Sequence, residues 1–168
     1  MPHYFVSYSS RELHVENLLD ALNLVLGKHF EQRRTPAALE SGTSQYDQIL
    51  KGIEEASFCV VILDGLRPNV VFEYGIMAGK GKPVLLFQEE SAEVDVPGFF
   101  PVASSESEVK RTPLAVDSHF SDVKDQYRAN WFKSDPKKTR NVILEEYTKK
   151  VSKIKDFAEI QKTGPLFE

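Results

Sequence analysis

Apolar residues gather in short continuous runs separated by longer stretches with helical spacing. The runs at 4–8, 58–63 and 83–87 predict β-strands, and a more polar segment at 29–34 predicts an edge strand. Because 58–63 is apolar throughout, we expect it to be a central parallel strand covered on both faces. Residues 114–116 predict a fifth strand.

Three helices are predicted between these strands. Ser9 to Glu12 reads Ser-Ser-Arg-Glu, a capping box in front of an apolar stripe that ends at Gly27. Ser44 caps a second helix, and Pro68 and Asn69 begin a third. The expected inward positions are Val15, Leu18, Leu19, Leu22, Val25 and Leu26 in the first helix, and Tyr46, Ile49, Leu50 and Ile53 in the second.

The C-terminal half has a weaker pattern. Residues 89–112 are acidic, rich in serine and interrupted by proline, which is typical of an irregular segment. Residues 117–132 are interpreted as a short helix plus loop. A last helix begins at 134–136, Ser-Asp-Pro, and its expected inward positions are Val142, Ile143, Tyr147, Val151, Ile154 and Phe157.

The order β-α-β-α-β-α-β predicts an α/β fold with a doubly wound parallel sheet and helices on both faces. We expect the flavodoxin-like strand order 2-1-3-4-5 and a single domain over 1–168, with its core at 3–87. The end at 164–168 has no clear stop, which leaves room for a further domain.

Composition narrows the function classes. A net charge of -4 gives no basic field, so nucleic acid is not an expected partner. There is no 18-residue apolar segment and no signal peptide, and the single Cys59 cannot support a disulfide framework. We therefore expect a cytoplasmic protein without a membrane partner. The four histidines lack ligand spacing, so no metal site is expected.

Candidate site residues lie where the first and third strands end. Open α/β sheets bind ligands beyond the carboxyl ends of their strands, and helix N-termini there attract phosphates. The candidates are Tyr8, Ser9 and Ser10 after the first strand, Asp64, Gly65 and Arg67 after the third, and Asn69 and Glu73 in the helix that follows.

Each candidate also has a structural interpretation. Glu73 could be a solvent-facing glutamate stabilised by the helix dipole, and Ser9 could be only a helix cap. Tyr8 could be a strand-end aromatic or could stack on a base. Asp64 and Gly65 could form only a turn, or contact a substrate hydroxyl, and Arg67 could pair with a phosphate. In the same helix, Gly75 is expected to allow close packing on the sheet.

Two sequence motifs resemble those of known protein families. FVSYSSRE at 5–12 resembles the opening of TIR domains. ASFCVVILDG at 56–65 with PNVVFEYGIMAGKGKPVLLF at 68–87 resembles bacterial nucleotide-binding TIR-like domains and is similar to nucleoside 2-deoxyribosyltransferases. The resemblance covers 3–87 and implies that Glu73 is catalytic. The transferases usually carry an additional aspartate where this chain has Arg67, Pro68 and Asn69, and 89–168 matches nothing.

The resemblance implies cleavage of an N-glycosidic bond. A carboxylate stabilises the oxocarbenium-like sugar, and a neutral nucleobase normally needs a second acid in order to leave, a role still open to Asp64. Nicotinamide in NAD is already cationic and leaves without one. The leading hypothesis is therefore a TIR-like NAD glycohydrolase, a defence effector that self-associates and uses NAD as substrate without a cofactor. The alternatives are a deoxyribosyltransferase or N-glycosidase, and a non-catalytic module that binds a nucleotide or a partner domain.

Overall fold

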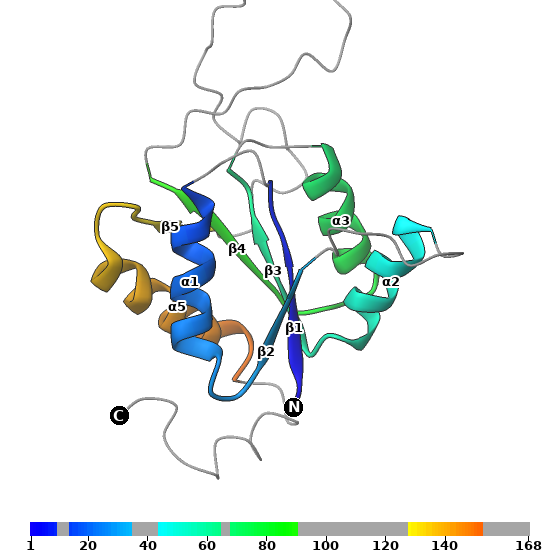
Figure 1. Cartoon of the computed structure of the whole chain (residues 1–168), viewed down its shortest axis with the longest axis horizontal. Helices are drawn as coiled ribbons and strands as arrows, with labels where there is room; N and C mark the ends of the chain where they lie inside the picture. The colour runs from blue at the N-terminus through cyan, green and yellow to red at the C-terminus, as the bar shows by residue number, and fades with distance from the viewer. Residues whose placement is uncertain (10–13, 35–43, 65–67, 91–127, 153–168) are drawn as a thin grey trace, which may run out of the picture.

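A computed structural model describes residues 1–9, 14–34, 44–64, 68–90 and 128–152. These residues form a five-stranded, all-parallel sheet with four helices, an α/β fold consistent with a doubly wound sheet (Figure 1). The strand order β2-β1-β3-β4-β5 confirms the expected order. The elements are β1 His3–Ser7, α1 Val15–Leu26, β2 Glu31–Arg34, α2 Gln45–Glu55, β3 Phe58–Ile62, α3 Pro68–Gly79, β4 Val84–Glu89, β5 Ala129–Trp131 and α5 Pro136–Lys150.

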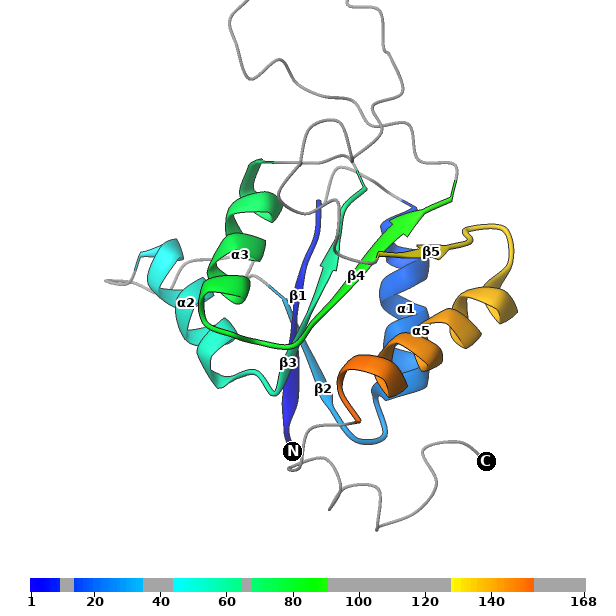
Figure 2. The same ribbon diagram turned by 180° about the vertical axis from the view of Figure 1, so that it is seen from behind.

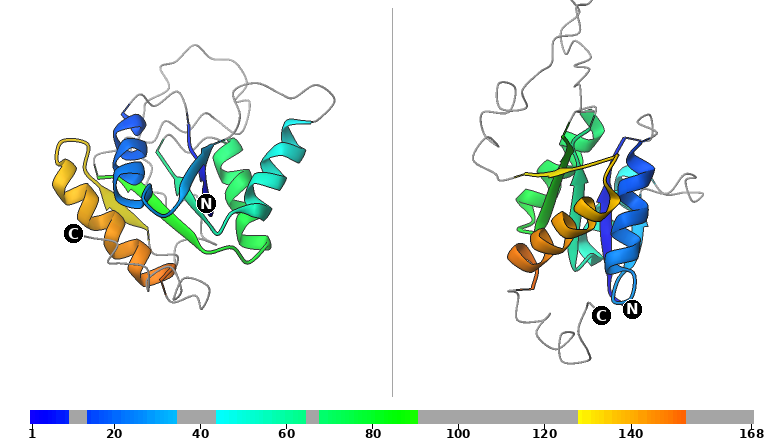
Figure 3. Two further views of the ribbon diagram at one scale, coloured as in Figure 1. Left: turned by 60° about the horizontal axis from the view of Figure 1, so that its bottom comes forward. Right: turned by 90° about the vertical axis from the view of Figure 1, so that its left-hand side faces the viewer.

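Two helix layers cover the sheet. Helices α1 and α5 lie on one face and α2 and α3 on the other, as the view from behind and the two rotated views also show (Figures 2 and 3). Strand β3 pairs with β1 and β4, and all five of its residues are buried, which confirms the central strand. Because side chains alternate along a strand, Val60 faces α1 and α5, whereas Cys59 faces α2 and α3.

Several local signals are confirmed. The Ser44 hydroxyl accepts a hydrogen bond from the amide of Asp47 at 3.1 Å and caps α2. The Asp135 carboxylate accepts one from the amide of Lys138 at 2.9 Å, with Pro136 in the first helical position of α5. Gly27 is the C-cap of α1.

Other expectations were wrong. Helix α1 begins at Val15, and its N-cap residue His14 makes no side-chain capping bond, so Ser9 does not begin this helix. Strand β5 occupies Ala129–Trp131, inside the segment interpreted as helix plus loop. Three residues are too few to produce a periodic signal, and tertiary pairing with β4 decides their conformation. The fifth strand expected at 114–116 lies outside the described residues.

Inward positions were mostly predicted correctly. Of the residues expected to be buried in α2, Ile49 and Ile53 are buried and Leu50 is partly buried, but 48% of Tyr46 is exposed. In α5, Ile143 and Tyr147 are buried, as is Val151 just beyond the helix, and Val142 is partly buried. The predicted Ile154 and Phe157 lie outside the described residues. Within those residues, no helix combines the length and apolar character needed to cross a membrane.

Two helical glycines differ in their surroundings. A Cβ atom added at Gly75 would meet nothing within 4 Å, so close packing of α3 on the sheet does not require this glycine. At Gly52 in α2, the same atom would lie 2.9 Å from the ring of buried Phe5. Close helix–sheet packing therefore depends on Gly52.

We expect Gly75→Ala to stabilise the protein by about 0.5–1 kcal/mol, because alanine restricts the unfolded chain and favours a helix. Gly52→Ala should destabilise it by about 1–3 kcal/mol, because Phe5 must shift in a filled core. Urea unfolding of both variants measures these changes. A destabilised Gly75→Ala protein would show that this glycine has a packing role.

Candidate functional site

Glu73 is a buried acid on the second turn of α3. Only 6% of the residue is exposed, and its carboxyl lies beside the hydroxyl of Ser7, the last residue of β1. Burial raises the pKa of Glu73 above its ordinary value of 4.5, and the Ser7 hydroxyl lowers this pKa by a smaller amount. The Ser7 Oγ contact is looser than a normal hydrogen bond.

The position of Ser7 follows from the pleat of β1. Phe5 faces α2 and α3, so Ser7 two residues later faces the same layer, at the carboxyl end of the strand. Among the described residues, none places a positive charge where it offsets the burial of Glu73. Within the described part of the chain, the site thus holds a largely buried carboxyl whose ionised form a bound cation would stabilise.

The Glu73 pocket is a cavity of about 200 Å³ between α2 and α3, lined by Gln45, Tyr46, Ile49, Asn69, Phe72 and Glu73. It brings together two of the predicted site residues, Glu73 and the exposed Asn69. The remaining residues that line it come from the first turns of α2 and from α3. Each wall is therefore mixed, with one aromatic residue and at least one polar residue from each helix.

Tyr8 does not lie on the Glu73 side of the sheet. It packs against the core between the sheet and helices α1 and α5, and the Arg34 guanidinium lies 5.7 Å from its ring centre. Tyr8 follows Ser7 directly, so the alternation of the strand sends the two side chains to opposite faces. Ser9 is buried and has an interaction partner.

Asp64 belongs to a second buried network. Its Oδ1 accepts a hydrogen bond from the amide of Glu89 at 2.7 Å, and its Oδ2 accepts one from Trp131 Nε1 at 3.0 Å. The Nε2 atom of His14 lies 3.5 Å from Oδ2, and the His14 ring stacks on Trp131. These contacts join the ends of β3, β4 and β5.

The charge state of Asp64 reflects this setting. Burial raises the pKa of Asp64, whereas the two hydrogen bonds and nearby His14 act in the opposite direction. Like Phe58, Val60 and Ile62, Asp64 lies on the α1 and α5 side of the sheet, where Trp131 and His14 contact it. The structure therefore places Asp64 and Glu73 in separate groups.

The other predicted site residues, Ser10, Gly65 and Arg67, lie outside the described residues. Sequence reasoning missed Ser7, Gln45 and Phe72 and assigned Tyr46 to the core. Ser7 lies in a mostly apolar run, so the sequence does not indicate which face of the sheet each residue of this strand occupies. A larger cavity of about 320 Å³ between α1 and the β5–α5 segment is lined by none of the predicted site residues. The described part of the chain contains no group of three potential metal ligands.

Comparison with known proteins finds no family model that matches this chain and no curated protein with significant similarity to it. These comparisons assign no family and no activity to the chain.

We expect Glu73→Gln to raise the melting temperature near neutral pH, because glutamine removes the cost of burying a charge. A raised folded-state pKa means that the native protein binds more protons than the unfolded chain between pH 4.5 and that pKa, so wild-type stability falls as pH rises through this interval. The difference between the two proteins should vanish below about pH 4.5. Melting curves from about pH 4 to about pH 8 test this expectation. A variant that is less stable than the wild type at neutral pH would contradict it.

Proposed function

We propose that this protein is an NAD glycohydrolase that cleaves the bond between nicotinamide and ribose. The observation that carries the proposal is the buried Glu73 carboxyl, which lines an open pocket without a compensating cation among the described residues. Its place at the carboxyl end of a parallel sheet is where α/β folds bind ligands. The resemblance of the chain to TIR-like domains supports the same assignment.

A cationic substrate suits such a carboxyl. Bound near Glu73, the pyridinium ring of NAD would favour the ionised carboxylate and lower its pKa. As the glycosidic bond breaks, its electron pair moves to the ring nitrogen and the positive charge moves to the ribose. The Glu73 carboxylate stabilises this oxocarbenium-like state, water attacks the sugar carbon, and one proton is released.

The alternatives fit the site less well. Cleavage of a neutral nucleoside needs an acid near the base, and Asp64 already accepts hydrogen bonds from Glu89 and Trp131 in a separate group. A purely binding module has no need for a buried carboxyl without a cation, because the group costs stability at neutral pH. The buried Glu73 carboxyl, which has no compensating cation among the described residues, therefore favours the hydrolase.

We expect Glu73→Gln to reduce nicotinamide release from NAD by about 100- to 1000-fold, because it removes the charge that stabilises the transition state. Nicotinamide is measured chromatographically after incubation with concentrated protein. The control is Glu145→Gln on α5, where the glutamate side chain is 68% exposed, and this substitution should have no effect. Wild-type turnover by Glu73→Gln would refute the role of Glu73, and cleavage of deoxynucleosides but not NAD would favour the transferase alternative.

We also propose that activity requires self-association. The Glu73 pocket opens beside the exposed Tyr46 and Phe72, so one copy of the chain does not enclose the reacting atoms. Specific activity should rise with protein concentration, as a second copy comes to cover the site. A dilution series of the wild-type protein measures this dependence, and constant specific activity over the whole series would argue for a self-sufficient monomer.

A further inference from the structure

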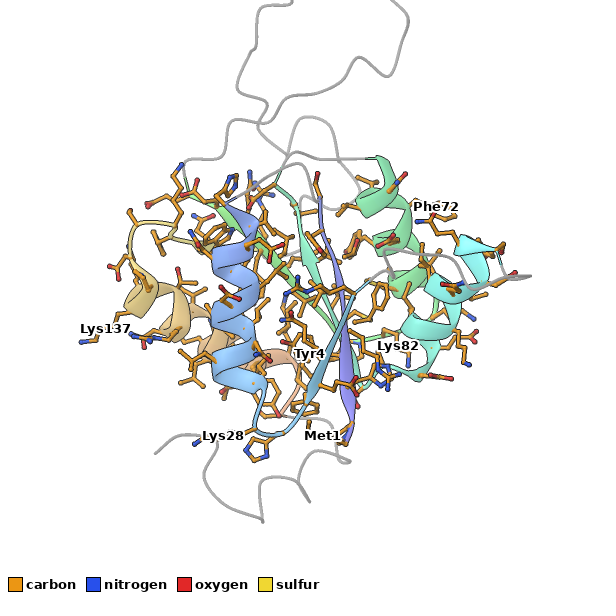
Figure 4. All side chains as sticks on the ribbon, in the orientation of Figure 1. Met1, Tyr4, Lys28, Phe72, Lys82 and Lys137 are labelled. Atoms are coloured by element: carbon orange, nitrogen blue, oxygen red, sulfur yellow. The ribbon has the colours of Figure 1, made fainter. Side chains whose placement is uncertain are left out.

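Two exposed aromatic side chains meet at the Glu73 pocket. Tyr46 is 48% exposed and Phe72 is 56% exposed, and their ring centres are 6.1 Å apart at an angle of 46°. Figure 4 shows Phe72 on the side of α3 where α2 lies. Within the described residues, four large hydrophobic side chains are exposed, and only these two adjoin each other and line one pocket.

Packing does not explain this aromatic pair. Neither residue belongs to either buried core cluster, and both rings leave about half of their surface in water. Burial of such surface in a complex is favourable, at roughly 25 cal/mol per Å². The pair is therefore suited to a contact with a ligand.

The charges around the pocket select the kind of ligand. Aromatic faces carry a negative potential, and Glu73, which lies on α3 next to Phe72, is also negative when it is ionised. A flat cation complements both features, because its ring stacks on the aromatic faces while its charge interacts with the carboxylate. The volume of about 200 Å³ falls below the roughly 300–1,000 Å³ of pockets that enclose a whole ligand, so it suits one ring system.

We propose that the Glu73 pocket is a subsite for a pyridinium ring, which stacks on one of the two aromatic side chains, Tyr46 or Phe72, and contacts the other. This inference depends on the proposed function for its biological ligand, the nicotinamide end of NAD. The adjoining ribose then lies next to Glu73, and the rest of the dinucleotide lies outside the pocket. Cleavage neutralises the ring, so the cation–π attraction weakens and nicotinamide leaves.

The direct test compares two small probes that differ in charge. 1-Methylnicotinamide is a pyridinium cation, and nicotinamide is its neutral relative. The wild-type protein should bind the cation about 2- to 30-fold more tightly, as measured by NMR titration. Tyr46→Leu and Phe72→Leu should each weaken binding of the cation, and Glu73→Gln should abolish the preference for it.

The controls separate ring stacking from general effects of mutation. Phe72→Tyr keeps an aromatic face and should retain binding, whereas Leu24→Ala removes an exposed apolar side chain on α1, on the opposite face of the sheet, and should change nothing. Melting curves establish that each variant is folded. Equal affinity for the two probes, or wild-type binding by both leucine variants, would overturn the subsite.

Kinetics distinguish this proposal from the proposed function. The leucine variants should raise KM for NAD about 5- to 10-fold and change kcat by less than about twofold, because stacking holds the ring to a similar extent in the ground state and the transition state. If NAD is cleaved through Glu73 while both variants keep the wild-type KM, the subsite fails and the hydrolase stands. If the pyridinium probe binds as expected while NAD is not cleaved, the hydrolase fails and the subsite stands.

Discussion

The alternation of side chains along β1 and β3 is the constraint on which the rest of this structure depends. Both strands are buried on their two faces, so each successive residue must fit a different helix layer. At the carboxyl ends of the strands, the same alternation separates polar residues that adjoin in the sequence. Ser7 meets Glu73 on the α2 and α3 side, and Tyr8 packs on the other.

Two of the buried carboxyl groups, those of Asp64 and Glu73, differ in their hydrogen-bond partners. Asp64 accepts hydrogen bonds from a backbone amide and an indole, and it links three strands. Among the residues that the structure describes, Glu73 has only the weak contact with Ser7, and it lines a pocket. A buried carboxyl with several hydrogen-bond donors stabilises a fold, whereas one with a single hydroxyl contact that borders a cavity is suited to stabilising charge in a ligand.

The aromatic pair, Tyr46 and Phe72, is the feature that would give the Glu73 pocket its selectivity for a flat cation. Tyr46 occupies a position that periodicity assigns to the buried stripe of α2, yet it extends to the surface and contacts Phe72. The first turn of α2 is therefore exposed, and it forms part of a wall of the pocket instead of part of the core. Because Tyr46 and Phe72 are both exposed, the pocket is open to solvent.

The sequence by itself determined the alternation of strands and helices, the strand order, the buried β3 and the helix starts at Ser44 and Asp135, because these follow from local patterning and capping chemistry. It also singled out Glu73 through its place after β3 and through the family resemblance. Only the tertiary structure decided which neighbours Glu73 has. An apolar strand buried on both faces carries no periodic signal, so whether Ser7 or Tyr8 faces α3 could not be read from β1. The short β5, and with it the network of Asp64 and Trp131, depends on pairing between residues 40 or more positions apart in the chain, which no local pattern records.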